Sequence, residues 1–230
     1  MLDELKEQVC RANLELVSRG LVIETWGNVS GVDRQAGRVV IKPSGVGYAQ
    51  LKPEHMVVVD LADGRVAEGS LRPSSDTPTH LELYRAFAGI GGVVHTHSLY
   101  ATAWAQAQRD IPPLGTTHAD YFAGPVPCTR PLTAREIAGQ YEANTGKVIV
   151  ERLAALEAEH FPAVLVAAHG PFAWGATPAQ AVEHAAVLEH LAQLAAATVA
   201  IEPYPRPILP ELLNKHFFRK HGPGKYYGQQ

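Results

Sequence analysis

The sequence predicts one α/β domain over residues 1–230, a three-layer α/β/α protein whose central sheet is mixed and mostly antiparallel. Helical and strand-like patterns alternate along the chain, so the sheet should carry helices on both of its faces. An Asp63-Gly64 pair between two apolar runs predicts a hairpin, which argues against a purely parallel, doubly wound sheet. No internal repeat, low-complexity tract or linker-like stretch divides the 230 residues, so we expect a single domain.

The elements of the first half follow from apolar spacing. A stripe at every third or fourth residue predicts an N-terminal helix with Gly20 as its stop, through Leu2, Leu5, Val9, Ala12 and Leu16. Residues 38–45 and 56–69 are typical of strands, and the second segment contains the hairpin. Pro78 suits the first position of a helix that ends near Phe87. A short buried strand over 91–98 and a helix over 98–107 should follow.

The second half repeats this alternation. Thr133 and Glu136 form a capping box that should open a helix, and residues 163–170 are typical of a buried strand. Thr177, with Pro178 and Gln180 after it, should start a long helix through about residue 198. One more helix is expected over 210–220, before a glycine-rich tail at 221–230.

Composition excludes several classes of protein. Twenty Lys and Arg against 23 Asp and Glu give a formal charge of −3 without any run of five like charges, so we expect no nucleic-acid or membrane partner. Cys10 and Cys128 are far apart in sequence, which favours a reducing cytoplasm over a disulfide framework. The charged N-terminus does not resemble a signal peptide, and the most apolar window is too short to cross a bilayer.

Three of the 11 histidines stand at predicted strand ends. His95 and His97 are two residues apart, so their rings should point to the same side of the sheet. His169 ends another apolar strand, and the Gly170-Pro171 turn after it should leave its ring at the sheet edge. Three neutral imidazoles and an open position describe a catalytic zinc site. Each histidine could equally be an ordinary core or surface residue.

Other polar segments could bind an anion. Asp76, with Ser74 and Ser75 before it, precedes a helix and is either the helix cap or a carboxylate that needs a cation. TWGNVS (25–30) and IKPSG (41–45) are ordinary turns or oxyanion cradles, and Lys42 would add a positive charge. GTTHADYF (115–122) has poor periodicity, which is typical of a functional loop. The tail is either a frayed end or a docking segment.

In their order along the chain, these segments resemble the class II aldolase/adducin-head family. The resemblance runs from the first helix to the final YYGQ and is carried by TWGNVS, IKPSG, PSSDTPTH, VVHTHS, GTTHADYF and HGPF. Aldolases and dehydratases of the family differ at GTTHADYF, PCTR and KHFFRKHG, so these pieces make the chain most similar to the family's sugar-phosphate epimerases.

The resemblance implies a cofactor and a set of site residues. A divalent metal, zinc or alternatively manganese or cobalt, would be held by Asp76, His95, His97 and His169. Substrate phosphate would be held by Gly27, Asn28, Lys42, Ser44, Gly45, Ser74 and Ser75. Asp120 and Tyr227 would be the acid/base pair, with Tyr227 donated by the tail of the adjacent subunit of a homotetramer. Thr116, Glu142 and His216 would surround the reacting centre.

The activity implied is inversion of carbon 4 of a ketopentose 5-phosphate, which would interconvert L-ribulose 5-phosphate and D-xylulose 5-phosphate. That carbon bears no acidic hydrogen, so the bond between carbons 3 and 4 must break, with metal assistance, and re-form on the other face of the aldehyde. A fuculose-phosphate-type aldolase would instead release the aldehyde, but that relative carries glutamate where Asp76 stands. A non-catalytic scaffold of the adducin type would not need a complete set of metal ligands.

Overall fold

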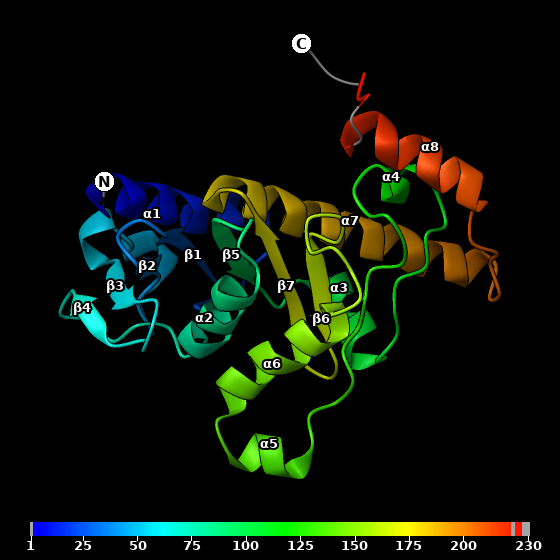
Figure 1. The fold of residues 1–230 in the computed structure, drawn as a ribbon. Helices are drawn as coiled ribbons and strands as arrows, with labels where there is room; N and C mark the ends of the chain where they lie inside the picture. The colour runs from blue at the N-terminus through cyan, green and yellow to red at the C-terminus, as the bar shows by residue number, and fades with distance from the viewer. Residues whose placement is uncertain (1, 222–223, 227–230) are drawn as a thin grey trace.

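The computed structural model describes residues 2–221 and 224–226, which fold into three layers (Figure 1). The central sheet has seven strands in the order β4-β3-β2-β1-β5-β7-β6. Their bounds are β1 (Asn28–Asp33), β2 (Arg38–Ile41), β3 (Val57–Asp60), β4 (Val66–Glu68), β5 (Gly92–His95), β6 (Ala163–Val166) and β7 (Gly170–Gly175). Every neighbouring pair is antiparallel, and the one parallel contact between described residues is an isolated bridge from Cys128 to Leu165. The expected α/β/α fold with a mostly antiparallel sheet is confirmed.

Helices cover both faces of this sheet. On one face lie α1 (Leu2–Ser18), α7 (Pro178–Ile201) and, beside α7, α3 (Leu99–Gln106), while α2 (Thr77–Ala86) and α6 (Tyr141–Leu153) lie on the other (Figure 1). Neighbouring residues of β1 face opposite sides of the sheet and therefore contact different helix layers. A side chain at Gly31 would clash with Leu5 of α1 and Pro178 of α7, whereas the hydroxyl of Ser30 lies 2.8 Å from that of Tyr84 on α2.

The smaller elements lie around this body. They are α4 (Thr116–Ala119), α5 (Ala134–Ala138), α8 (Pro210–His221) and two 3₁₀ turns, Tyr48–Gln50 and Pro53–His55. Helix α8 packs against α4 at one end of the molecule, where Phe217 is fully buried (Figure 1). The hairpin expected at Asp63-Gly64 joins β3 to β4, and the positive φ of Gly64 (78°) explains why glycine stands there.

The structure corrects the sequence-based expectation at β1. Asn28–Asp33 is a strand in the middle of the sheet, although TWGNVS was expected to be a turn. The strand contains Asn28, Ser30 and Gly31, which are poor strand formers in isolation. Tertiary contacts override that preference, because Gly31 allows close helix packing and Ser30 is hydrogen-bonded on the opposite face.

Two boundaries also differ from the expected ones. Gly170-Pro171 begins β7 rather than forming a turn, and the turn lies just before it, where Ala168 adopts a positive φ of 59°. The capping box at Thr133 opens a helix of five residues, and a break at Gly139 separates that helix from α6. Glu142 therefore lies in the first turn of α6 and not in the helix that the capping box opens.

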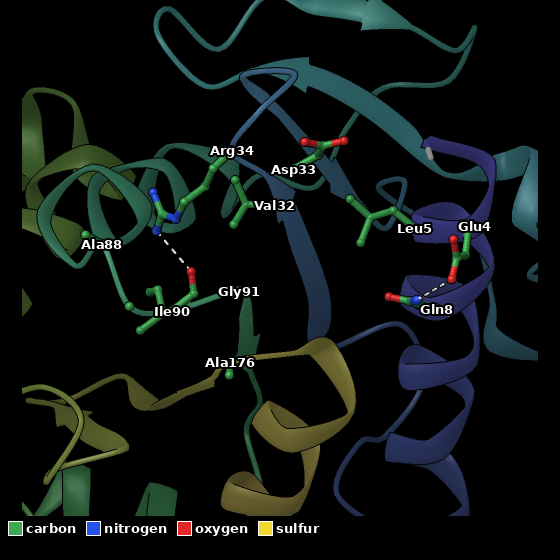
Figure 2. Close-up of a pocket in the computed structure, with 11 residues that line it drawn as sticks. Glu4, Leu5, Gln8, Val32, Asp33, Arg34, Ala88, Ile90, Gly91 and Ala176 are labelled. Carbon is green, nitrogen blue, oxygen red and sulfur yellow. Dashed lines mark hydrogen bonds between the residues drawn. The ribbon is translucent and has the colours of Figure 1, made fainter.

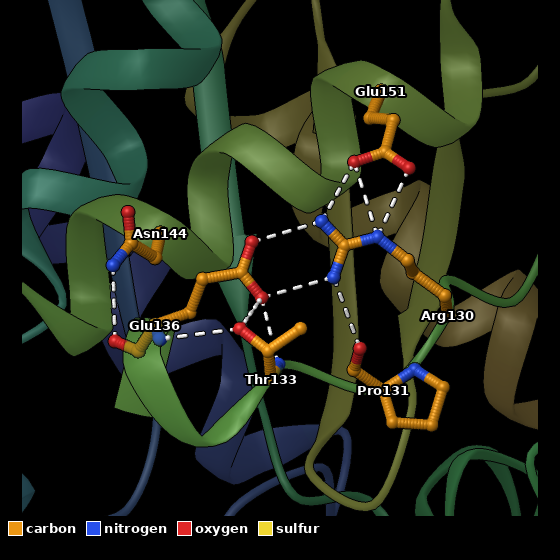
Figure 3. A network of polar contacts seen from close by, with 6 residues as sticks. All are labelled: Arg130, Pro131, Thr133, Glu136, Asn144 and Glu151. Carbon is orange, nitrogen blue, oxygen red and sulfur yellow. Dashed lines mark hydrogen bonds and ion pairs between the residues drawn. The ribbon is translucent and has the colours of Figure 1, made fainter. Parts of the chain in front are cut away.

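An ion-pair network fixes the approach to α5 (Figure 3). The guanidinium of Arg130 lies between two carboxylates and donates two bonds of 2.9 Å to Glu136 and three, of 2.8, 3.0 and 3.2 Å, to Glu151 on α6. The carboxylate of Glu136 also accepts from the backbone N–H of Thr133 at 2.7 Å. The network thus joins the loop before α5 to α6, and since it is exposed we assign it a structural role.

Helix α7 is the core helix of its layer. Within the described part of the chain it is the one helix that could cross a membrane by length and composition. Its buried residues, Ala181, Val182, Ala185, Leu188, Leu191, Ala192 and Ala195, recur at helical spacing. They form the face that packs toward β5, β7, α1 and α3. The side chain of Thr177 caps the helix by accepting the N–H of Gln180 at 3.1 Å.

Candidate active site

Antiparallel pairing gathers three chain segments at one edge of the sheet. Asn28, the first residue of β1, pairs with His95, the last residue of β5, and His95 pairs with Phe172 of β7. His97 lies two residues beyond β5, and His169 ends the turn that precedes β7. Because neighbouring antiparallel strands begin and end at the same edge, side chains distant in sequence meet there.

The three predicted histidines converge. His95, His97 and His169 each contribute one ring nitrogen to a cluster in which all three nitrogens lie within 4.8 Å of one another. The Nε2 atoms of His95 and His97 are 3.2 Å apart, and the ring of His169 is centred 4.8 Å from that of His95. Three imidazole nitrogens gathered in this way could bind one divalent transition metal.

Contacts behind the rings orient them. Nδ1 of His95 donates to the carbonyl of Pro171 at 3.0 Å, which leaves Nε2 as an acceptor, and Phe172 stacks on the ring at 4.2 Å. Burial lowers the pKa of His95 and of His97, and it lowers that of His169 to about 4. All three rings are therefore neutral at neutral pH, the state in which imidazole binds a metal.

Asp76 stands next to the histidines. It occupies the cap position of α2, but its side chain makes no capping bond there. Instead, Oδ2 accepts a 2.7 Å bond from Nδ2 of Asn28. Burial by itself would raise the pKa of Asp76, but attraction to His95 and the Asn28 bond lower it on balance. An ionised Asp76 lines the same pocket as the three neutral imidazoles, and this histidine triad fits a divalent metal.

The phosphate-binding candidates line the same pocket. This cavity of about 250 Å³ is bounded by Gly27, Asn28, Lys42, Ser44, Gly45, Ser74 and Ser75, together with Asp76 and the three histidines. Gly27 has a φ of 96°, and a side chain there would lie 2.9 Å from the carbonyl oxygen of His95. Glycine therefore allows the backbone to pass directly beside the histidines.

Lys42 is the cationic side chain of this pocket. Only 1% of the residue is exposed, its Nζ donates to the carbonyl of Val46 at 2.9 Å, and it lies 4.9 Å from the centre of the Tyr48 ring. Burial lowers the pKa of Lys42. A buried ammonium with serine hydroxyls nearby can balance the charge of an anion such as a phosphate group.

The predicted acid/base residue Asp120 belongs to a different cluster. It follows α4, and its carboxylate is held by α8: Nδ1 of His216 lies at 3.1 Å, Nη2 of Arg219 at 2.9 Å and Nζ of Lys220 at 3.3 Å. Burial tends to raise the pKa of Asp120, but the bonds from His216, Arg219 and Lys220 outweigh it and lower the pKa. Asp120 and His216 thus lie together, away from the residues that line the metal pocket.

The remaining predicted residues are dispersed. Thr116 is the first residue of α4, close in sequence to Asp120. Glu142 lines a separate hollow that borders Ser74 and Ser75, and its backbone carbonyl accepts a 2.6 Å bond from Thr79. Tyr227 lies outside the residues that the structure describes. Within one chain, therefore, the metal and phosphate candidates meet in one pocket, whereas Thr116, Asp120, Glu142 and His216 do not line it.

A larger hollow elsewhere offers no comparable chemistry (Figure 2). It lies between the start of α1 and the end of β1 and has a volume of about 480 Å³. The guanidinium of Arg34 is directed to the carbonyls of Tyr84, Phe87 and Ile90, so it holds the end of α2. The acidic groups in this hollow, Glu4 and Asp33, are not accompanied by a histidine or cysteine.

Sequence reasoning missed two contributors to the site. Tyr141 places its hydroxyl 3.3 Å from Nδ1 of His169, and no periodicity or motif distinguishes this residue in the sequence. Trp26 lines the pocket edge-on to His97, with ring centres 6.5 Å apart, yet remains 55% exposed. The sequence signal available for Trp26 was its position within TWGNVS, a segment already expected to contribute to the site.

Comparisons with known proteins identify a matching family, similar sequences and similar solved structures. Residues 7–196 match the family described as the class II aldolase and adducin N-terminal domain. The chain is 57% identical, over 100% of both chains, to the L-ribulose-5-phosphate 4-epimerase UlaF of Salmonella paratyphi C, and equally to that of Salmonella typhi. Among solved structures, an L-fuculose 1-phosphate aldolase superposes with a TM-score of 0.78 at 26% identity, covering 93% of this chain and 94% of the aldolase. The L-fuculose-1-phosphate aldolase from Thermus thermophilus has a TM-score of 0.69 at 28% identity, with 89% and 100% covered.

Proposed function

The chain belongs to the class II aldolase and adducin N-terminal domain family, and from that premise we propose that it interconverts L-ribulose 5-phosphate and D-xylulose 5-phosphate. The observation that carries the proposal is the convergence of His95, His97, His169 and Asp76 in the pocket that also contains the buried Lys42. The chain is 57% identical to the UlaF epimerases over its full length, which favours epimerisation. The two solved structures compared above are instead named as aldolases, which would cleave the sugar and release the aldehyde.

We propose that the three histidines and Asp76 hold a divalent metal, with zinc as the first candidate and manganese or cobalt as alternatives. When bound there, such an ion would supply Lewis acidity toward the oxygens of a sugar. The protein's own part is to keep the imidazoles neutral and oriented and to keep Asp76 ionised through Asn28. Lys42, with Ser44, Ser74, Ser75 and the backbone at Gly27 and Gly45, would hold the phosphate, so that a cleaved aldehyde stays tethered during its rotation.

Two proton carriers are required, one on each face of that aldehyde. We assign these roles to Asp120 and Tyr227. Because Asp120 is grouped with α8 rather than with the metal pocket, the proposal places it at the pocket of a neighbouring copy. The same arrangement would bring Thr116, Glu142 and His216 near the reacting centre. The functional unit is thus proposed to be a cytoplasmic homotetramer with shared active sites, in which the tail 221–230 completes a neighbouring site and neither nucleic acid nor membrane takes part.

The test is an epimerisation assay with L-ribulose 5-phosphate and D-xylulose 5-phosphate, with chelated protein and with added zinc, manganese or cobalt. We expect interconversion that disappears on chelation and returns with metal. His97→Asn should lower metal content and activity together, by about 10-fold or more. Stoichiometric release of free aldehyde instead of the epimer would favour the aldolase, and full activity in exhaustively chelated protein would refute the metal site.

A further inference from the structure

His169 is supported differently from His95. His95 ends a strand that is paired on both sides, and its Nδ1 is held by the backbone carbonyl of Pro171. His169 lies in the turn between β6 and β7, next to Ala168 with its positive φ. Its Nδ1 is opposite a side chain, the hydroxyl of Tyr141, at 3.3 Å. The orientation of the third imidazole therefore depends on where Tyr141 is placed.

Tyr141 is placed by the packing of α6 on α2. Gly146 of α6 approaches Glu82 of α2 so closely that a Cβ at Gly146 would lie 2.6 Å from that of Glu82. Thr79 of α2 donates its hydroxyl to the carbonyl of Glu142 at 2.6 Å, and Thr145 donates to the carbonyl of Tyr141 at 2.9 Å. The first turn of α6 is thus fixed to the helix that directly follows Asp76.

The contact is compatible with the tautomer of His169 in which Nδ1 carries the proton. A neutral imidazole has one N–H and one lone pair. If Nδ1–H donates to the oxygen of Tyr141, the lone pair is on Nε2 and can point toward His95 and His97. The aromatic rings of Tyr141 and His169 are 6.1 Å apart and inclined by 30°, so the phenol also limits rotation of the imidazole. Tyr141 is not among the residues that line the pocket, so it acts behind His169.

We propose that Tyr141 is a positioning residue for the metal site. Its oxygen accepts a hydrogen bond from Nδ1–H of His169 and so holds Nε2 toward the other two histidines, which couples the third imidazole to the helix that follows Asp76. This inference rests on the metal site of the proposed function and adds to it a residue that is neither a ligand nor in contact with substrate.

The experiment compares wild type, Tyr141→Phe and a matched control, Tyr84→Phe. The control removes a buried hydroxyl that bonds to Ser30 at 2.8 Å rather than to a candidate ligand. Zinc affinity is measured by competition with a chromophoric chelator, the ligand field from the visible spectrum of the cobalt form, and stability from thermal unfolding of the metal-free proteins. We expect Tyr141→Phe to bind zinc about 10-fold or more weakly, with a changed cobalt spectrum, as for other lost partners of metal-binding histidines. Tyr84→Phe should change stability without changing metal affinity.

Each other outcome counts against the inference. Equal zinc affinity and an unchanged cobalt spectrum in Tyr141→Phe would overturn it. A loss of affinity accompanied by an equal destabilisation of metal-free Tyr141→Phe, with the cobalt spectrum retained, would reduce Tyr141 to a structural residue and overturn it as well. Wild-type protein that binds neither zinc nor cobalt would overturn the proposed metal site itself, and the role of Tyr141 with it.

Discussion

The side-chain amide of Asn28 donates both to Oδ2 of Asp76, at 2.7 Å, and to the hydroxyl of Ser74, at 3.1 Å. One residue at the start of β1 therefore joins the proposed metal ligand to the proposed phosphate-binding loop. The hydrogen bond from the Asn28 side chain lowers the pKa of Asp76. Because it occupies Oδ2, it leaves Oδ1 as the carboxylate oxygen available to a metal. A change at Asn28 should consequently affect metal binding and substrate binding together.

Asn28→Ala should weaken metal binding by about 10-fold, because partners of ligating carboxylates have effects of this size. The Michaelis constant for the sugar phosphate should rise at the same time. Metal titration followed by steady-state kinetics at saturating metal measures both. The matched control is Asn144→Ala, which removes an amide that bonds the carbonyl of Glu136 at 2.9 Å, away from the pocket. Unaltered metal affinity in Asn28→Ala, with the control also unaltered, would contradict the role assigned to Asn28.

Lys42→Met should impair substrate binding more than metal binding. The substitution keeps an apolar stem of similar length but removes the buried charge and its bond to Val46. A lost charge-assisted hydrogen bond of about 1.5–3 kcal/mol corresponds to a rise of roughly 10- to 100-fold in the dissociation constant of the phosphate. Competition by inorganic phosphate and the Michaelis constant are the readouts. Lys52→Met, on an exposed side chain beside Glu54, is the control, and equal phosphate binding by the two variants would disprove the assignment.

The stability of the metal-free protein should fall as pH decreases from about 6.5 toward 4. Burial lowers the pKa of His118 to about 4 and that of His80 to about 3, from 6.5. The unfolded chain therefore binds protons in this range that the folded chain does not, so stability is present above pH 6.5 and is lost on acidification. For His118 alone, which is 4% exposed, the loss is about 3 kcal/mol.

Urea unfolding at pH 7 and pH 5 measures this dependence. His118→Gln should reduce the difference between the two pH values, because glutamine can still donate toward the carbonyl of Gly124 but does not titrate. An equal pH dependence in wild type and His118→Gln would show that other groups are responsible.

The sequence predicted the layers because they depend on local apolar spacing. The stripe from Leu2 to Leu16, the apolar run before His169 and the cap at Thr177 each require only neighbours in sequence. β1 could not be found in this way, since Asn28, Ser30 and Gly31 are poor strand formers. The segment becomes a strand through helix packing at Gly31 and pairing on both edges.

The residues that line the pocket could be predicted from the sequence, but the side chains that hold them in place could not. His95, His97 and His169 stand at strand ends, and a strand end is a position that sequence can locate. The partners of these residues come from elsewhere: Asn28 reaches Asp76 across 48 residues, and Tyr141 reaches His169 across 28. Tertiary packing alone creates such pairs. Likewise, Asp120 is grouped with α8 by contacts to residues that are 96 or more positions away in the sequence.

Mixed tetramers test whether one site uses two chains. If His97 of one chain works with Asp120 of its neighbour, His97→Asn and Asp120→Asn are each strongly impaired in epimerisation alone but complement each other when unfolded together and refolded. Random assembly with fourfold symmetry restores about one quarter of the wild-type sites, because each site then needs one particular neighbour. Activity in the mixture no greater than the sum of the separate variants would place both residues at one chain's own site or refute the tetramer.

The last prediction concerns the two sides of the cleaved aldehyde. If Asp120 and Tyr227 serve opposite faces, Tyr227→Phe removes one proton carrier and leaves the other, and epimerisation should fall by about 10²- to 10⁴-fold. Metal content and oligomeric mass should be unchanged, since the phenol is assigned no ligand role. Carbon–carbon cleavage should persist for the one epimer whose hydroxyl faces Asp120, and Asp120→Asn should retain cleavage of the other epimer. Trapping of glycolaldehyde phosphate from each epimer separately measures this. Equal loss of cleavage of both epimers in both variants would refute the two-sided model and leave Tyr227 as a residue that only closes the site.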